Sequence, residues 1–279
     1  MHSTKIITIT TLLSFAFTVP LAGCGRGSKG DARDKAVVAV EACDSIPSPV
    51  KKLVRAVADN DSDGFAALVS YPLQRPYPLR DIRDADEMKK YYRELVDDSL
   101  RKVITTSGPE KWSEYGWRGW TLDDGRYIWV DDDVYDVQYI SQKELKAIDS
   151  LSRREVETMA PSLRQGWLPT LCLRDDTRGT VYRIDKRTRH DRGQGGHHYR
   201  LAVYGPGSDL REIPAQLLEG LMENEGTAGT VIYRFHDRSG AETIIEPDAP
   251  DTPSPILVTP SDSTIELTRA YWHELVEGN

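Results

Sequence analysis

The amino-acid sequence predicts an α+β fold, in which N-terminal helices pack on a curved antiparallel sheet and a smaller all-β domain follows. Three observations support this prediction. Apolar residues recur at helical spacing between residues 36 and 104, and the spacing becomes that of strands from Trp112 to Ile140. Short aromatic and β-branched runs separated by turns then fill the chain from about Trp167 onward.

The composition describes a polar, acidic chain that is long enough for two domains. Its 279 residues are 29% charged and carry a formal net charge of −8. Nucleic acids reward basic protein surfaces, so this balance argues against a nucleic-acid partner. We divide the chain into residues 1–23, a glycine-rich flexible tether over 24–34, and two folded domains over 35–165 and 166–279.

The first 24 residues have the pattern of an export signal. Lys5 and the apolar stretch from Ile6 to Leu21 precede Leu21-Ala22-Gly23-Cys24, which resembles the lipobox of bacterial lipoproteins. The resemblance implies that the signal peptide is removed, that Cys24 is lipidated, and that the protein is held at the cell envelope. Gly25 favours the outer membrane. A transmembrane helix is the competing interpretation, but an apolar stretch of about 16 residues is shorter than the ~20 that span a bilayer.

Helical signals dominate the start of the first domain. We expect helices over residues 36–43 and from Ser48 and Pro49, which have the composition of an N-cap followed by a first helical residue. Asp61 or Ser62 is expected to cap a short helix, and one amphipathic stretch runs from about Asp84 to Ile104. The helix after Ser48 should bury one face, formed by Val50, Leu53, Val54 and Val57.

Strand signals follow. The aromatic and β-branched run from Trp112 to Ile140 predicts a meander of three strands, with turns at Asp123-Asp124-Gly125 and Asp131-Asp132-Asp133. A helix is then expected over about Gln142 to Leu163. Its apolar stripe, expected to pack against the core, is Leu145, Ile148, Leu151, Met159 and Leu163.

The second domain has the pattern of a β-rich fold. The proline-rich stretch from Glu246 to Pro255 predicts an extended connector on its surface. The expected strands are Leu168 to Leu173, Thr180 to Asp185, His198 to Val203, Val231 to His236, Thr243 to Glu246, Ile256 to Thr259 and Thr264 to Tyr271.

The first domain resembles a known superfamily. Paired short helices ending in Asn60-Asp61-Ser62-Asp63-Gly64-Phe65-Ala66-Ala67-Leu68-Val69, a longer helix and a curved meander look like the NTF2-like, cystatin-like cone superfamily. The resemblance covers about residues 35–140. It implies a sheet that wraps a helix and leaves a pocket, a scaffold shared by enzymes, binding proteins and structural modules.

Cysteine usage fits an oxidising compartment. If Cys24 is lipidated, Cys43 and Cys172 remain as an even pair. They either form a disulfide or remain small buried thiols, because sequence alone does not fix the separation that a disulfide requires.

Local patterns that imitate metal sites have simpler interpretations, and we expect no metal and no cofactor. The run from Asp59 to Gly64 begins like a calcium loop but has Ser70 where the twelfth position needs a glutamate. Adjacent His197 and His198 would point to opposite faces of a strand, and His190 lies in a polar loop. The three aspartates from Asp131 fit a solvated turn.

A dense aromatic cluster is the best candidate for a ligand site. Four of the six tryptophans lie between residues 112 and 129 and offer a stacking platform for a sugar or an apolar ligand. A packed sheet face is the alternative interpretation. We place the candidate site at the wide end of the cone, built from Trp112, Trp117, Trp120 and Trp129 of the meander and Tyr91 and Tyr92 of the long helix.

No catalytic motif is visible: the sequence has no nucleophile elbow, zinc helix, glycine-rich phosphate loop or Cys-His pairing. We therefore expect a noncatalytic, lipid-anchored envelope protein that binds a glycan, peptidoglycan or an envelope protein. The alternative is an NTF2-like pocket enzyme of the isomerase or hydrolase type, acting on a small apolar or sugar substrate with Asp136 or Asp124 as general base.

Overall fold

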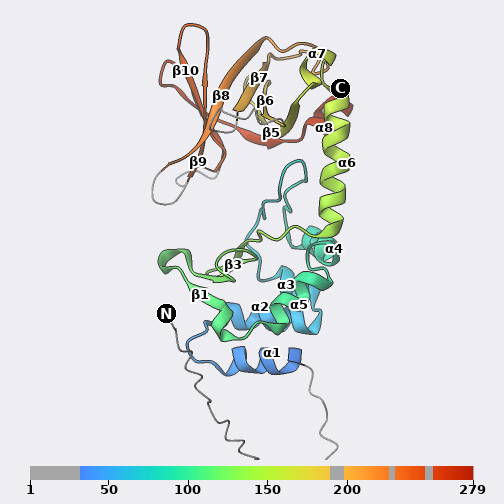
Figure 1. The fold of residues 1–279 in the computed structure, drawn as a ribbon, viewed down its shortest axis with the longest axis vertical. Helices are drawn as coiled ribbons and strands as arrows, with labels where there is room; N and C mark the ends of the chain where they lie inside the picture. Colours follow the sequence, from blue (N-terminus) through green and yellow to red (C-terminus); the bar gives the residue numbers. More distant parts are fainter. Residues whose placement is uncertain (1–31, 189–197, 226–229, 249–253, 279) are drawn as a thin grey trace, which may run out of the picture.

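The computed structural model describes residues 32–188, 198–225, 230–248 and 254–278. Two sheets are separated along an elongated molecule, and one long helix runs between the parts that hold them (Figure 1). The α+β class is thereby confirmed. Cys24, His190 and His197 lie outside the described residues, as does most of the expected tether.

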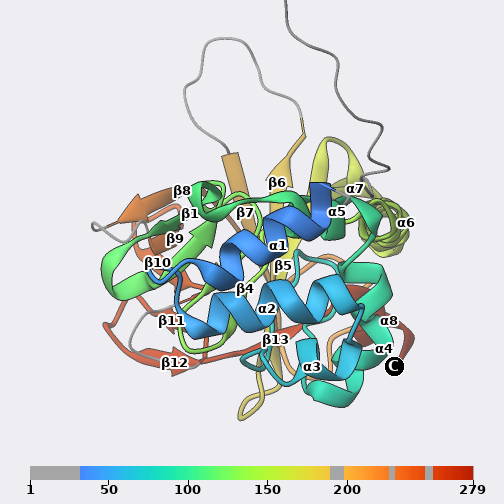
Figure 2. The same cartoon turned by 90° about the horizontal axis from the view of Figure 1, so that it is seen from below.

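Five helices form the base of the first domain, and α1 and α2 lie side by side at the end farthest from the second sheet (Figure 2). Val50, Leu53, Val54 and Val57 are fully buried, so the predicted face of α2 is confirmed. Ser48 is already helical, and Pro47 takes the cap position. The helices are α1 (Ala32–Ala42), α2 (Ser48–Asp59), α3 (Ser62–Ala66), α4 (Ala85–Leu95) and α5 (Asp98–Thr106).

The expected single stretch from Asp84 to Ile104 is wrong, because the chain breaks it into α4 and α5. Asp97 causes the break: its carboxylate accepts hydrogen bonds from the backbone N–H groups of Ser99 and Leu100, each at 3.0 Å. Satisfying these otherwise unpaired donors starts a second helix. By contrast, Asp61 caps α3 as expected, accepting from Gly64 N at 2.9 Å.

The small sheet has four short antiparallel strands in chain order, one more than predicted. Asp123, Asp124 and Gly125 all have positive φ and form the expected turn. The inner face packs on the helices and fills the core of the domain with Trp112, Leu122, Ile128, Val130 and Val134. The elements are η1 (Pro109–Lys111), β1 (Trp112–Glu114), η2 (Gly116–Arg118), β2 (Trp120–Leu122), β3 (Trp129–Val130) and β4 (Val134–Asp136).

The helix expected over Gln142 to Leu163 ends at Thr158, as α6 (Gln142–Thr158). Of its expected apolar stripe, Met159 and Leu163 are buried, but both lie beyond α6. Leu145 is 44% exposed, and the residues that α6 buries are Glu144 and Glu155. The reason is its position: α6 links the two domains and is packed mainly near its ends (Figure 1). The short α7 (Pro161–Arg164) follows and buries Leu163.

The second sheet curls almost into a barrel. In the described residues it has nine antiparallel strands in the order β12-β11-β10-β9-β8-β7-β6-β5-β13. Only Leu267 separates β12 from β13, although they lie at opposite edges, so the two edges must approach each other. The strands are β5 (Trp167–Asp175), β6 (Thr180–Arg187), β7 (His198–Tyr204), β8 (Gln216–Glu225), β9 (Thr230–His236), β10 (Glu242–Glu246), β11 (Ile256–Val258), β12 (Thr264–Glu266) and β13 (Thr268–Ala270).

The second domain departs from the prediction in three ways. The sequence did not indicate β8, and the expected last strand is split into β12 and β13. The domain is also not all-β, because α8 (Trp272–Glu277) follows β13 and contacts α6.

The disulfide alternative for Cys43 and Cys172 is not realised. Both are free thiols: Cys43 packs against the core of the first domain, and Cys172 is buried in a cluster on the second. They sit in separate cores, so no bridge joins them.

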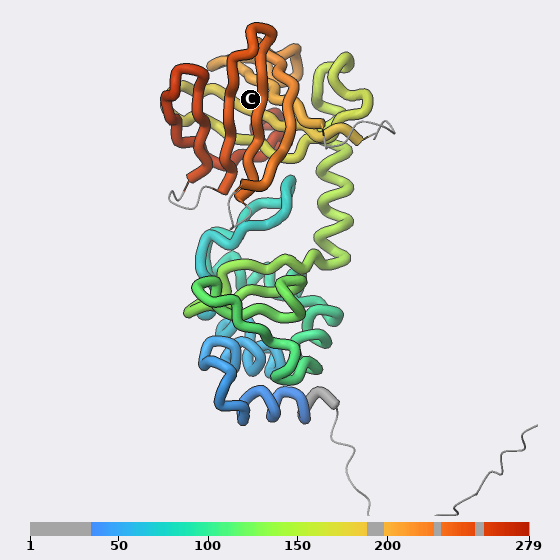
Figure 3. The backbone as a smooth tube through the Cα atoms, turned by 60° about the vertical axis from the view of Figure 1, so that its left-hand side comes forward, coloured from blue at the N-terminus to red at the C-terminus, as the bar shows by residue number. Residues whose placement is uncertain are grey.

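A strap over residues 71–84, which we call the arm, rises from the first domain to the barrel beside α6 (Figure 3). Arg75 on the arm is buried against Glu144 of α6 at 2.8 Å, and its Nη1 and Nη2 donate to the carbonyl oxygens of Val137 and Tyr139. At the other end of α6, Glu155 accepts from the backbone N–H of His273 at 3.3 Å and lies 2.8 Å from its Nδ1. The arm and α6 therefore hold the two domains together.

Candidate ligand-binding pocket

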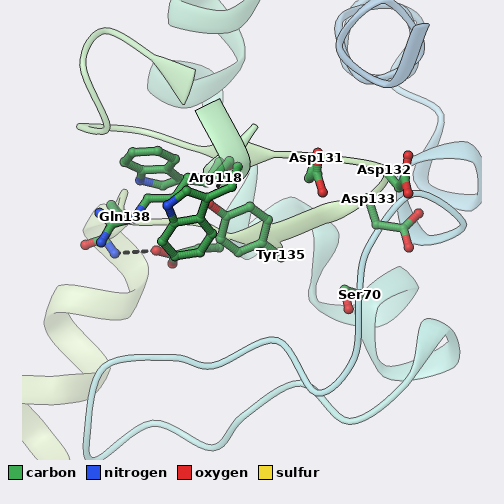
Figure 4. A pocket seen from close by; sticks show the side chains of 10 residues that line it. Ser70, Arg118, Asp131, Asp132, Asp133, Tyr135 and Gln138 are labelled. Atoms are coloured by element: carbon green, nitrogen blue, oxygen red, sulfur yellow. Dashed lines mark hydrogen bonds between the residues drawn. The ribbon is translucent and has the colours of Figure 1, made fainter. Parts of the chain in front are cut away.

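A cavity of about 640 Å³ lies where η2, β3 and β4 meet the loop after α3. Figure 4 shows Arg118, Tyr135 and Gln138 gathered in one part of it, with Asp132, Asp133 and Ser70 farther along. Its volume falls within the range of small-molecule sites. The lining residues are Ser70, Trp117, Arg118, Trp129, Asp131, Asp132, Asp133, Tyr135, Asp136 and Gln138.

The turn at η2 places Trp117 in the solvent. Gly116 and Gly119 flank it with φ of 56° and 74°, values that glycine adopts without strain. A Cβ at Gly119 would lie 2.4 Å from the carbonyl oxygen of Val130, so the turn lies close against the chain of β3. The result is a tryptophan with 81% of its surface exposed.

The other aromatic side chains are held by one another. Trp129 meets the edge of Tyr115 at a centroid distance of 5.4 Å and lies 6.5 Å from Tyr135. The Tyr135 hydroxyl donates to the carbonyl oxygen of Arg118 at 2.9 Å, and the Arg118 guanidinium lies 5.1 Å from the Trp117 ring. These contacts hold Trp129 and Tyr135 in place, while Trp117 remains largely exposed.

The pocket is negatively charged. Asp131, Asp132, Asp133 and Asp136 stand against a single lining cation, Arg118. The Gln138 amide donates to Asp136. Partial burial, followed by the charge of Asp136, raises the pKa of Tyr135, which therefore stays protonated at neutral pH. Such a lining repels anions and accepts hydrogen bonds from hydroxyl or amino groups.

Only Trp117 and Trp129 of the six proposed ligand residues line this pocket. Trp112 is buried in the core, and Trp120 packs against it. Tyr92 is also buried, 5.3 Å from Phe65, and the Tyr91 hydroxyl donates to Glu144 at 3.2 Å. The six residues therefore do not form one pocket, because four of them are buried in the core of the first domain or pack against it.

Arg118 and Tyr135 were not expected at a ligand site, and Asp131, Asp132 and Asp133 were expected only as a turn. That turn is real: it joins β3 to β4, and Asp131 N donates to the Asp133 carbonyl at 3.0 Å. The available signal was an acidic turn flanked closely by Trp129 and Tyr135, since a short hairpin brings its two ends together.

The described residues also bear on a metal site and on a membrane span. In that part of the chain, no group of three or more His, Cys, Asp or Glu side chains could hold a metal ion. No helix there is long and apolar enough to cross a membrane.

Comparisons with known proteins give no relative: no family model, no curated protein and no solved structure matches the chain. The chemistry of the pocket is therefore the basis on which a function can be proposed.

Proposed function

We propose that this is a lipid-anchored protein of the bacterial cell envelope that binds a glycan without negative charge. The observation that carries the proposal is Trp117, 81% exposed beside Trp129 and Tyr135 and bordered by carboxylates. The lipobox pattern ending at Cys24 supports the anchor, and placement at the outer membrane rests on Gly25. We include in this proposal an NTF2-like scaffold for the first domain, which the order of helices and meander in the sequence supports.

Aromatic faces and carboxylates together suit a sugar. A sugar ring presents apolar C–H groups on its faces and hydroxyl groups around its edge. The faces of Trp and Tyr rings carry a negative quadrupole and attract the slightly positive C–H groups. Carboxylates such as Asp136 accept hydrogen bonds from hydroxyl groups at the rim. Both halves of the lining therefore find a complement in one ligand.

The charge of the lining restricts the class of glycan. Four carboxylates face one guanidinium, so uronic acids and phosphorylated sugars would be repelled. Amino sugars, which are cationic, would gain from the carboxylates and the aromatic faces. We therefore expect affinity to rank amino sugars first, neutral sugars next and acidic sugars last.

Binding without catalysis fits this site better than the enzyme alternative. A general base works best when the site excludes water and tunes the base. Asp136 instead lines an open pocket beside the exposed Trp117. Asp124, the other candidate base, lies in the exposed turn after β2, where Tyr115 donates to it at 3.4 Å. Neither carboxylate is enclosed.

The binding proposal can be tested by calorimetric titration of residues 24–279. The probes are oligomers of glucosamine, N-acetylglucosamine and galacturonic acid of equal length. We expect binding in that order, with the acidic oligomer inactive, and at least tenfold weaker binding by Trp117→Ala. Trp112→Phe, a conservative change in the buried core, serves as the control. Tightest binding of the acidic oligomer, or full affinity in Trp117→Ala, would contradict the proposal.

The anchor has its own test. Intact mass of the protein purified from its native envelope should correspond to a chain that begins at Cys24 and carries acyl chains. Retention of Met1 together with an unmodified Cys24 would reject it.

A further inference from the structure

The aromatic pocket continues toward the second domain. A second cavity, of about 340 Å³, lies between the domains, and Asp136 and Gln138 belong to the walls of both. The two cavities therefore adjoin at these two side chains.

The far wall of this second cavity is one open end of the barrel. Thr170 and Leu171 of β5, Met222 of β8, and Val231 and Tyr233 of β9 line it. Tyr233 is buried among the barrel's interior residues, whereas Met222 and Val231 are only partly buried. The barrel thus presents an apolar mouth toward the first domain.

The near wall is polar and built on the arm. Gln74, Arg75 and Tyr77 line it, together with Ile140 before α6. Arg269 of β13 donates to Gln74 at 2.9 Å and pairs with Asp248 at 2.8 Å, so its charge is compensated within the protein. An apolar wall and a polar wall therefore face each other across this space, and its arginines are paired with carboxylates of the protein.

We propose that the binding site spans both domains and takes a linear oligosaccharide of several amino-sugar units, N-acetylated where they reach the barrel mouth. This inference rests on the proposed function. One end of the oligosaccharide stacks at Trp117 and Trp129, and the chain passes Asp136 and Gln138 to the barrel mouth. The apolar mouth suits the methyl of an acetamido group, and the amide oxygen of Gln138 can accept from its N–H. Gln74 instead supports the wall, because its amide donates to Asp248 at 3.0 Å and accepts from Arg269 at 2.9 Å.

The two domains are held for such a ligand before it binds. The buried Arg75–Glu144 pair and the contact of Trp272 Nε1 with Thr158 Oγ1 at 2.9 Å fix α6 to both ends of the molecule. A groove fixed in advance loses less entropy when a long ligand binds. Affinity should therefore increase with each sugar unit that reaches a new contact.

The test is the dependence of affinity on chain length. Calorimetry with N-acetylglucosamine oligomers, from dimer to hexamer, should show hexamer affinity at least tenfold above that of the dimer. Val231→Asp at the mouth should leave the dimer unaffected and reduce the hexamer to the level of the dimer. Val203→Asp is the matched control, because Val203 is a partly buried valine lining a cavity at another part of the barrel.

A second variant guards against misfolding of the first. Met222→Lys introduces a charge on a flexible stem that can reach water, so the barrel is expected to tolerate it. It should also remove the gain from chain length. Equal affinity for dimer and hexamer, or a full length dependence in both mouth variants, would overturn the two-domain site while leaving the pocket intact. Failure of every oligomer to bind would overturn the proposed function as well.

Discussion

The two sheets use aromatic side chains in opposite ways. In the barrel, Tyr199 and Phe235 pack against Tyr233 at centroid distances of 5.1 and 6.3 Å, all buried in the interior. In the small sheet, Trp117 and Tyr135 are exposed by 81% and 41% and line a pocket. These aromatic side chains therefore stabilise the interior of the barrel, whereas Trp117 and Tyr135 are available for contact with a ligand.

Strand length explains the difference. The barrel strands β5 to β9 have seven to ten residues, long enough for inside and outside positions to alternate. The strands of the small sheet have two or three residues, so its aromatic side chains are placed by turns such as η2 and by strand ends. A turn can point a large side chain into solvent, whereas a continuous strand would pack the same side chain against its neighbours.

The largest expected effect separates these two uses directly. Phe235→Ala should lower the free energy of unfolding by about 3–5 kcal/mol, because it leaves a cavity in the barrel core. Trp117→Ala should change it by less than about 0.5 kcal/mol, because the side chain touches little. Urea unfolding, monitored by circular dichroism, measures the free energy of unfolding of both variants. Comparable destabilisation by the two substitutions would show that Trp117 is structural.

The next effect concerns the link between the domains. Arg75→Met leaves Glu144 buried without its partner and should destabilise the protein by about 3–5 kcal/mol. Adding Glu144→Gln should recover part of the loss, because glutamine is uncharged and can keep the capping box at Ser141. Thermal unfolding of both variants is the measurement. A double variant no more stable than the single one would contradict the buried-charge explanation.

A smaller effect is expected at the turn that presents Trp117. Gly119→Ala forces a Cβ to within 2.4 Å of the Val130 carbonyl and should destabilise by about 1–3 kcal/mol while weakening oligosaccharide binding. Gly116→Ala is the control: its φ is also positive, but no atom lies within 4 Å of the added Cβ. We expect a smaller loss of stability and unchanged binding for it. Weaker binding in both variants alike would exclude a specific role for the close contact at Gly119.

The smallest effect is chemical and leaves stability unchanged. A hydrogen bond with Ser45 lowers the pKa of Cys43, so this thiol ionises and reacts more readily than an ordinary cysteine near neutral pH. Burial raises the pKa of Cys172, which stays protonated. Iodoacetamide at pH 7.5 should label Cys43 but not Cys172 in the folded protein, and both of them in urea. If mass spectrometry finds neither Cys43 nor Cys172 labelled in urea, the result would instead indicate a disulfide.

Regular elements were predictable from the sequence because their signals are local. The stripe of α2 and most barrel strands follow from periodicity alone. The exception in the barrel is β8, where Gly220 weakens the strand signal although the fold needs it: a Cβ there would lie 2.0 Å from the Arg234 carbonyl.

The site was less predictable, because its geometry depends on tertiary placement. Periodicity put the stripe of α6 in a core, but the helix joins two domains and buries Glu144 instead of Leu145. The density of tryptophans pointed to a group of residues of which Trp117 and Trp129 line the pocket, whereas Tyr92 lies in the core and Tyr91 packs against it. Local sequence predicted that aromatic residues gather, and the turns decided which of them face solvent.

The most direct test of the aromatic pocket follows the indole N–H signals of all six tryptophans by two-dimensional NMR during titration with the N-acetylglucosamine hexamer. Trp117 and Trp129 line the pocket, while Trp112 and Trp272 are buried in separate cores. If the pocket binds the hexamer, we expect the signals of Trp117 and Trp129 to shift with a common saturation curve and those of Trp112 and Trp272 to stay in place. Saturable shifts confined to tryptophans outside the pocket, or no shift at any of the six, would contradict binding in this pocket.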